Sequence, residues 1–234
     1  LDEFETKLFD LPEGVYTCLI ENEDCEEQIL TPGMDDEIFS RTKVPMTKNE
    51  VRVLSISRLE LTKKAVVYDV GSGTGSVSVE CARLSPDIAV FAIEQKEEAA
   101  NLTKENAVRL GLSDQIMVIN KKAPEGFEEL PTPTHVFIGG SSGALSDILS
   151  AIQKKLIVKE NTKGVRVVIN AVSLETIAQI TKLIQTYPVK HVQLTQIQAS
   201  RAHKLGSYNL MQAQNPVLIA SFNLLPDDKM EADE

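Results

Sequence analysis

A short apolar run that leads into a glycine-rich turn constrains this chain more than any other feature. Residues 65–70 combine valines with a tyrosine, as in a buried strand. Three glycines follow at alternate positions, Gly71, Gly73 and Gly75. Glycine lets a backbone turn sharply and approach a ligand closely. The pattern therefore predicts an α/β fold with a nucleotide-like ligand at the carboxyl end of this strand.

The glycine spacing indicates which ligand the turn holds. Dinucleotide-binding turns follow a G-x-G-x-x-G pattern and wrap a pyrophosphate at a helix N-terminus, but Ser76 stands where the last of those glycines would be. Glu94 ends the next expected strand, and Asp69 precedes the turn by two residues. S-adenosylmethionine carries no phosphate and needs acidic partners for its ribose hydroxyls and its ammonium group. We expect this cofactor, with Glu94 at the ribose and Asp69 near the ammonium; a nicotinamide dinucleotide or a plain tight connection are the alternatives.

Composition further limits the class of protein to which the chain can belong. The chain has 234 residues and 42% hydrophobic content, which suits one sizeable α/β domain with an additional segment. Its formal net charge of −10 predicts no nucleic-acid partner. No apolar run approaches the roughly twenty residues of a membrane span, so no membrane partner is expected. Cys18, Cys25 and Cys81 have no C-x-x-C spacing, which predicts reduced thiols of a cytoplasmic protein and no metal site.

The rest of the chain alternates between strand and helix patterns. Strands are expected at about 65–70, 88–94, 116–120, 135–138 and 165–171, and helices at about 76–84, 96–110, 145–156 and 173–186. This alternation predicts a parallel sheet with helices on both faces. Two further strands at 189–199 and 216–224 match the end of the seven-stranded, Rossmann-like sheet of class I methyltransferases, which has one antiparallel strand. Between them, 200–208 is expected to be a basic and polar connector that reaches over the substrate.

A capping box is expected to open an earlier helix. Thr47 is followed three residues later by Glu50 and then by an apolar run that starts at Val51. This is the pattern of a helix whose first N–H groups bond to a threonine side chain. We therefore expect Thr47 to cap the helix.

Both ends of the sequence are expected to lie outside the main domain. Residues 15–20 have a strand pattern and are followed by an acidic stretch. Because the chain begins with Leu1 and not Met, we interpret residues 1–32 as the strand and linker of an upstream domain. The main domain is then 33–225, and 226–234 is an acidic tail.

Seven short motifs carry a family resemblance. They are Val44–Arg52, Asp69–Gly75, Ala92–Glu94, Ala123–Glu125, Val136–Ser141, Asn170–Glu175 and Asn215–Val217. Together they resemble the decarboxylating precorrin methyltransferases of cobalamin biosynthesis. The resemblance implies methyl transfer from S-adenosylmethionine to carbon 15 of a corrin precursor, a tetrapyrrole of the precorrin-6Y or cobalt-precorrin-6B type, with loss of carbon dioxide from the carbon-12 acetate. It also implies a homotetramer and, upstream, a carbon-5 methyltransferase domain of which 1–32 would be the remnant.

Carried over by position, the resemblance also implies where the cofactor binds. The contacts fall on Thr47, Gly71, Ser72, Gly73, Thr74, Gly75, Glu94 and Ala123. The chain departs from the family pattern twice, with Lys121 and Lys122 before the Ala-Pro-Glu motif, where an acidic residue is common, and with Ser142 in place of a glycine. We therefore expect a changed adenine contact and a reshaped turn after the fourth strand.

A corrin precursor carries many carboxylates, so an acidic protein needs a local basic patch to bind it. We expect Arg201 and His203 to contact the substrate, together with Gly140, Ser141 and Ser142 of the turn after the fourth strand. Solvated surface positions are the alternative for the charged residues. Decarboxylation also needs a general acid. The same turn and His203 are candidates for it, and no catalytic residue is assigned.

Two other functions stay open at this point. A methyltransferase of the same fold could act on RNA or protein. Against RNA, the chain has neither the Pro-Pro-aromatic nor the Pro-Cys motif of base-modifying enzymes, and only 5% of its residues are aromatic. Alternatively, the domain could bind the cofactor without catalysis and serve as a scaffold.

Overall fold

The computed structural model describes residues 14, 15, 17, 29, 31–158 and 163–227. The expected strand at 15–20 and the tail at 226–234 fall mostly outside these residues and stay predictions. Within the described part of the chain, no helix has the length and apolar character needed to cross a membrane.

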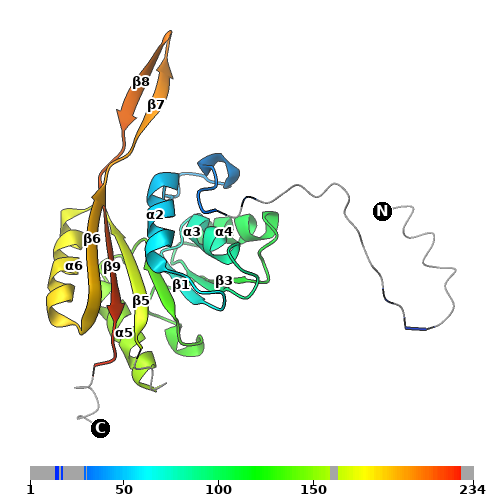
Figure 1. The fold of residues 1–234 in the computed structure, drawn as a ribbon. Helices are drawn as coiled ribbons and strands as arrows, with labels where there is room; N and C mark the ends of the chain where they lie inside the picture. Colours follow the sequence, from blue (N-terminus) through cyan, green and yellow to red (C-terminus); the bar gives the residue numbers. More distant parts are fainter. Residues whose placement is uncertain (1–13, 16, 18–28, 30, 159–162, 228–234) are drawn as a thin grey trace.

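A seven-stranded sheet forms the centre of the described chain (Figure 1). In spatial order its strands are β3 (Ile116–Ile119), β2 (Ala89–Ile93), β1 (Val66–Val70), β4 (His135–Ile138), β5 (Val165–Ala171), β9 (Val217–Leu224) and β6 (Val189–Ile197). Pairing is parallel from β3 to β5, while β9 runs antiparallel to both β5 and β6. The predicted parallel sheet with one antiparallel strand is confirmed.

Helices cover both faces of the sheet (Figure 1). They are α2 (Asn49–Leu59), α3 (Ser76–Ala82), α4 (Glu97–Arg109), α5 (Leu145–Val158) and α6 (Leu174–Thr186). Alternate residues of β1 face different layers: Tyr68 and Val70 join a core with α5 and α6, whereas Val67 joins the core with α2 and α3. Burial of both faces explains why the parallel strands read as continuous apolar runs.

The start of α2 differs from the expected capping box. The residue that precedes the helix is Lys48, not Thr47, and no side-chain hydrogen bond caps it. Instead, Asp36 of the short 3-10 turn η1 (Asp36–Ile38) accepts the backbone N–H of Asn49 through Oδ1 at 3.1 Å. The prediction for Thr47 is therefore wrong, because a carboxylate from an earlier segment satisfies the helix N-terminus and complements its dipole.

The expected connector after β6 is a second sheet. β7 (Ser200–Leu205) and β8 (Tyr208–Ala213) pair antiparallel around a two-residue turn that begins at Gly206, whose φ is 62°. This hairpin projects beyond the body of the domain (Figure 1). A Gly-Ser pair between two strand-length segments is a hairpin signal, and the polar composition of the segment obscured it.

Candidate functional site

A cavity of about 1300 Å³ opens at the carboxyl ends of the parallel strands. Its wall includes the loops that follow β1, β2, β3 and β4, the 41–48 loop before α2, and the base of the hairpin. Open α/β sheets bind their ligands at this edge. The structure brings eleven of the predicted site residues to this wall: Thr47, Gly71, Ser72, Gly73, Glu94, Ala123, Gly140, Ser141, Ser142, Arg201 and His203.

Backbone crowding enforces glycine at two positions of the turn after β1. Gly71 has a φ of 72°, and a Cβ there would lie 2.6 Å from the carbonyl oxygen of Gly140. Gly73 has a φ of 58°, and a Cβ there would lie 2.7 Å from the carbonyl oxygen of Pro45. A side chain at either position would be strained and would also collide with backbone. The backbone of the turn therefore packs directly against the backbone of the loop after β4 and of the 41–48 loop.

The carboxylate of Glu94 closes the turn from the neighbouring strand. It is buried, and it accepts the N–H of Gly73 through Oε2 at 3.1 Å and that of Lys96 through Oε1 at 2.9 Å. The N–H of Gly71 donates to the carbonyl oxygen of Ile93 at 2.8 Å. These N–H donors are thus already hydrogen-bonded within the protein, and the Glu94 carboxylate places a negative charge beside them. This arrangement fits a ligand with hydroxyl groups better than a pyrophosphate, which needs free N–H donors.

Three predicted cofactor residues do not reach the cavity wall. Asp69 alternates with its neighbours along β1 and points toward α3, where its Oδ2 accepts a hydrogen bond from Ser78 Oγ at 2.5 Å. Burial raises the pKa of Asp69 to about 6. Thr74 is fully buried, and a Cβ on Gly75 would lie 2.7 Å from the side chain of Thr103. Because side chains alternate along a strand, Asp69 faces the helix layer and not the cavity, so the expectation that it faces the ligand is wrong. Thr74 and Gly75 instead connect the turn to the helix layer.

The turn after β4 forms another part of the rim. Ser142, which replaces a family glycine, has a φ of 48° in the left-handed region. Its Oγ accepts a hydrogen bond from Gln95 Nε2 at 2.7 Å. This bond joins the loops that follow β2 and β4. The serine thus keeps the left-handed backbone expected of a glycine and adds a contact that glycine cannot make.

Basic residues outnumber acidic residues on the cavity wall. The basic residues are Arg41, Lys43, Lys48, Lys96, Lys121, Lys122, Arg201 and His203; the acidic ones are Glu94 and Glu98. In a chain with a net charge of −10, this local reversal favours an anionic ligand. Among the described residues, no group of three or more His, Cys, Asp or Glu side chains is placed to hold a metal ion.

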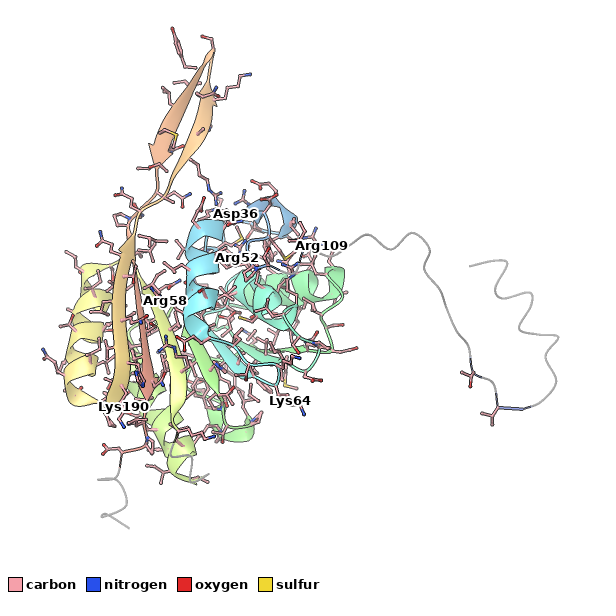
Figure 2. The ribbon with its side chains drawn as sticks, in the orientation of Figure 1. Asp36, Arg52, Arg58, Lys64, Arg109 and Lys190 are labelled. Carbon is pink, nitrogen blue, oxygen red and sulfur yellow. The ribbon has the colours of Figure 1, made fainter. Side chains whose placement is uncertain are left out.

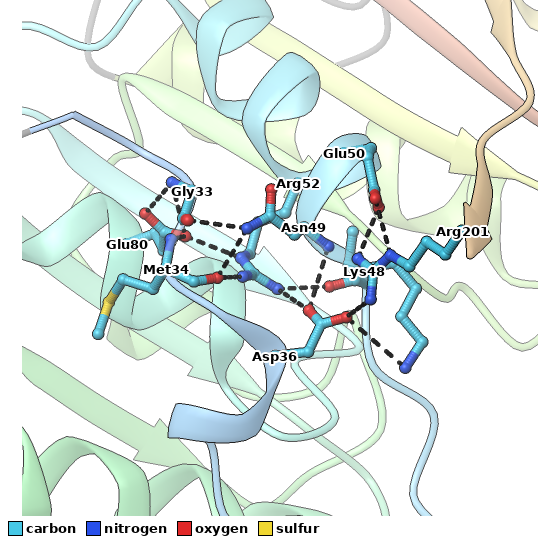
Figure 3. A network of polar contacts seen from close by, with 10 residues as sticks. Gly33, Met34, Asp36, Lys48, Asn49, Glu50, Arg52, Glu80 and Arg201 are labelled. Atoms are coloured by element: carbon cyan, nitrogen blue, oxygen red, sulfur yellow. Dashed lines mark hydrogen bonds and ion pairs between the residues drawn. The ribbon is translucent and has the colours of Figure 1, made fainter. Parts of the chain in front are cut away.

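Arg201 lines the cavity but is bound by protein carboxylates. Its Nε and Nη2 donate to the two oxygens of Glu50 at 2.7 Å each, and its Nη1 donates to Asp36 Oδ2 at 2.8 Å (Figure 3). The hydrogen bonds from Arg201 hold the pKa of Glu50 below its usual range, and those to Glu50 raise the pKa of Arg201. The guanidinium is thus already engaged within the protein, which does not support its expected contact with a substrate carboxylate.

Sequence reasoning missed the role of Arg52, which lies fully buried on α2 (Figure 2). Its Nε donates to Glu80 Oε1 at 2.9 Å, and its Nη1 donates to Asp36 Oδ1 at 3.1 Å and to the carbonyl oxygen of Thr47 at 2.7 Å (Figure 3). Its Nη2 donates to the carbonyl oxygen of Met34. Buried charges are tolerated when they are paired and hydrogen-bonded in this way. The one signal in the sequence is an arginine within the apolar stripe of a helix.

The strand order and the cavity at the strand ends define a class I methyltransferase fold. A family model described as the precorrin methyltransferase domain matches residues 37–223. The chain belongs to this family, and the resemblance drawn from its motifs is confirmed.

Individual relatives agree with the family. A probable cobalt-precorrin-6B C(15)-methyltransferase (decarboxylating) of Pyrobaculum calidifontis is 39% identical over 191 residues, which cover 81% of this chain and 94% of that protein. The solved precorrin-6Y C5,15-methyltransferase of Geobacter metallireducens has a TM-score of 0.74 and 30% identity, and the match covers 82% of this chain and 96% of that one. The precorrin 8w decarboxylase of Methanobacterium thermoautotrophicum has a TM-score of 0.72 and 31% identity, and the match covers 82% of this chain and 100% of that one.

Proposed function

We propose that this enzyme methylates carbon 15 of a corrin precursor of the precorrin-6Y or cobalt-precorrin-6B type and removes carbon dioxide from its carbon-12 acetate, as a step of cobalamin biosynthesis. Family membership and the names of the relatives support this reaction. The observation that carries the proposal is the cavity. It joins a glycine turn closed by the Glu94 carboxylate to a wall rich in basic side chains.

S-adenosylmethionine is the cofactor that this cavity fits. Gly71 and Gly73 let the turn pack against the backbone of Gly140 and Pro45 and still line the cavity. Glu94 presents a buried carboxylate suited to ribose hydroxyls, and Thr47 and Ala123 line the same wall. When bound, this cofactor supplies the methyl group. The residues of the turn therefore have to orient the reactants and exclude water.

The basic wall suits a substrate with several carboxylates, since charge-assisted hydrogen bonds to lysine and arginine stabilise such groups. Loss of carbon dioxide leaves a carbon that must receive a proton, which calls for a general acid near the substrate. His203, Ser141 and Ser142 line the cavity, and this position supports their candidacy as the general acid.

The direct test is incubation of the purified chain with methyl-labelled S-adenosylmethionine and the corrin precursor, with and without cobalt. We expect the precursor to gain one methyl group and lose one carbon dioxide, as read by mass spectrometry. Transfer of label to RNA or to protein instead would favour the alternative substrates. Tight cofactor binding without transfer to any tetrapyrrole would favour a scaffold.

We also propose that the enzyme is a homo-oligomer, with the four copies that the family resemblance implies. Large apolar side chains exposed on the hairpin support contact with other copies; they are Leu205, Tyr208, Leu210 and Met211. Light scattering should then give the mass of a tetramer, and a monomer at micromolar concentration would contradict the proposal.

We also propose a cytoplasmic location, which is supported by cysteines without paired spacing.

A further inference from the structure

One cluster of ion pairs ties the base of the hairpin to α2 and η1. We call Asp36, Glu50, Arg52 and Arg201 the Asp36 cluster. The Asp36 side chain is 1% exposed, and its two oxygens accept from Arg52 Nη1 at 3.1 Å and from Arg201 Nη1 at 2.8 Å. Lys48 Nζ lies 3.8 Å from the same carboxylate. Asp36 thus connects a buried arginine of the helix layer to an arginine of the projecting hairpin.

The Asp36 cluster acts on two walls of the cavity at once. Arg52 Nη1 holds the carbonyl oxygen of Thr47, which lies in the 41–48 loop. On the hairpin, Arg201 lies two residues before His203, so the two side chains share one face of β7. Both Thr47 and His203 line the cavity. Segments 165 residues apart in the chain, as Asp36 and Arg201 are, therefore meet in one polar network beside the ligand site.

One backbone hydrogen bond also lies at the base of the hairpin. The backbone N–H of Gln214 donates to the carbonyl oxygen of Ala199 at 2.9 Å, which closes the base of the hairpin on itself but does not join it to the helix layer. The bonds from Arg201 to Glu50 and Asp36 do join it to that layer. Glu50 does not line the cavity, so we expect its effect on the reaction to pass through Arg201.

We propose that Arg201 is a positioning residue that holds the hairpin base against α2 and η1, next to the 41–48 loop, so that His203 and Thr47 face the same bound substrate and cofactor. This inference rests on the proposed function, because it assigns the cavity to methyl transfer. It differs from the expectation that Arg201 binds a substrate carboxylate. A positioning residue acts only while its own partners, Glu50 and Asp36, are in place.

A double-mutant cycle with the full chain separates the two roles. The variants are Glu50→Gln, Arg201→Gln and their combination, with kcat and KM for the corrin precursor and the cofactor Kd measured for each. We expect Arg201→Gln to raise KM about tenfold with a smaller change in kcat, and Glu50→Gln to raise it less, because Asp36 still holds Arg201. The combination should be no worse than Arg201→Gln alone, because the contact with Glu50 is already lost in that variant. Arg201→Lys should restore only part of the loss, because an ammonium cannot reproduce the bidentate contact.

Lys204→Gln is the matched control, since it removes a positive charge from the same strand at a position outside the cavity wall. It should leave KM unchanged. Hydrogen exchange gives a readout that does not need turnover: amides of 200–205 and 41–48 should exchange faster in both Glu50→Gln and Arg201→Gln.

Impairment by Arg201→Gln with an unchanged or lower KM for Glu50→Gln would overturn the proposal, because the effect of Arg201 would then not depend on its contact with Glu50. Wild-type kinetics and exchange for both variants would overturn it as well. If the wild-type chain fails to methylate the precursor, the proposed function fails, and the exchange data still decide whether the Asp36 cluster holds the two segments together.

Discussion

The two sides of the cavity are held by different forces. On the turn side, Gly71 and Gly73 lie against backbone oxygens that leave no room for a Cβ atom. On the hairpin side, Arg201 and Asp36 join distant segments by ion pairs. Steric contact does not depend on salt, whereas a partly exposed ion pair is screened. The comparison teaches that the turn side of the cavity is fixed by shape and the hairpin side by charge.

Gly71→Ala tests the steric side and has the largest expected effect. Gly111 offers a matched control, because its φ of 70° is close to the 72° of Gly71 but a Cβ there meets nothing within 4 Å. Gly111→Ala should cost about 1–2 kcal/mol of unfolding free energy through backbone strain alone. Gly71→Ala must also displace the backbone of Gly140, so we expect failure to fold or a cofactor Kd raised more than about 100-fold, or about 3 kcal/mol. Urea denaturation and calorimetry measure both quantities, and equal effects of the two changes would contradict the steric account.

Asp69→Asn sharpens the comparison by probing a buried carboxylate of β1 just before the turn. Burial raises its pKa from the usual 3.8 to about 6, so the folded state holds this proton more tightly than the unfolded state does. Stability is therefore lost as pH rises from about 4 to about 6, by at most roughly 3 kcal/mol. An asparagine has no charge to bury, so the unfolding free energy of the variant relative to wild type should increase over this range. Urea denaturation at pH 4.5 and pH 7.5 tests this; a difference that does not change with pH would refute it.

Glu94→Gln tests the charge on the turn side. The carboxylate accepts two backbone N–H groups and lines the cavity, so its loss should weaken cofactor binding by about 10- to 100-fold, or about 1.4–2.7 kcal/mol. Glu97→Gln removes an exposed charge from the first turn of α4 and serves as the control. Calorimetric titration with S-adenosylmethionine measures both. Similar affinities for the two variants would mean that Glu94 does not bind the ligand.

Thr47→Ala has the smallest expected effect on stability. Because Asp36 and not Thr47 satisfies the start of α2, the change should alter the unfolding free energy by less than about 0.5 kcal/mol. A true capping threonine would cost about 1 kcal/mol. If Thr47 contacts the cofactor, its Kd should still rise a few-fold. Thermal denaturation and calorimetry on one preparation distinguish the two roles.

Local patterns predicted the parts of the fold that depend on local forces. The bounds of β4 and β5 match the sequence expectation at both ends, because strands buried on both faces read as continuous apolar runs. The glycine turn and Glu94 were also predicted, since glycine at a tight turn and a carboxylate at a strand end are visible in the sequence itself.

The rest depends on contacts between distant segments. No local pattern shows that Asp36 replaces Thr47 at the start of α2, or that Arg52 meets Glu80, since these partners come from different elements. The inward direction of Asp69 follows from the strand pleat, which the motif alone does not reveal. The hairpin had a local signal at Gly206, but the composition of the segment favoured a loop.

The closed base of the hairpin has one more consequence. Because Gln214 and Ala199 hold the two ends of the hairpin together, the length of the hairpin is independent of the pairing between β6 and β9. Residues could be added or removed in pairs at the tip without shifting the register of the main sheet. Mutation can therefore change how far the hairpin projects while the rest of the domain keeps its shape.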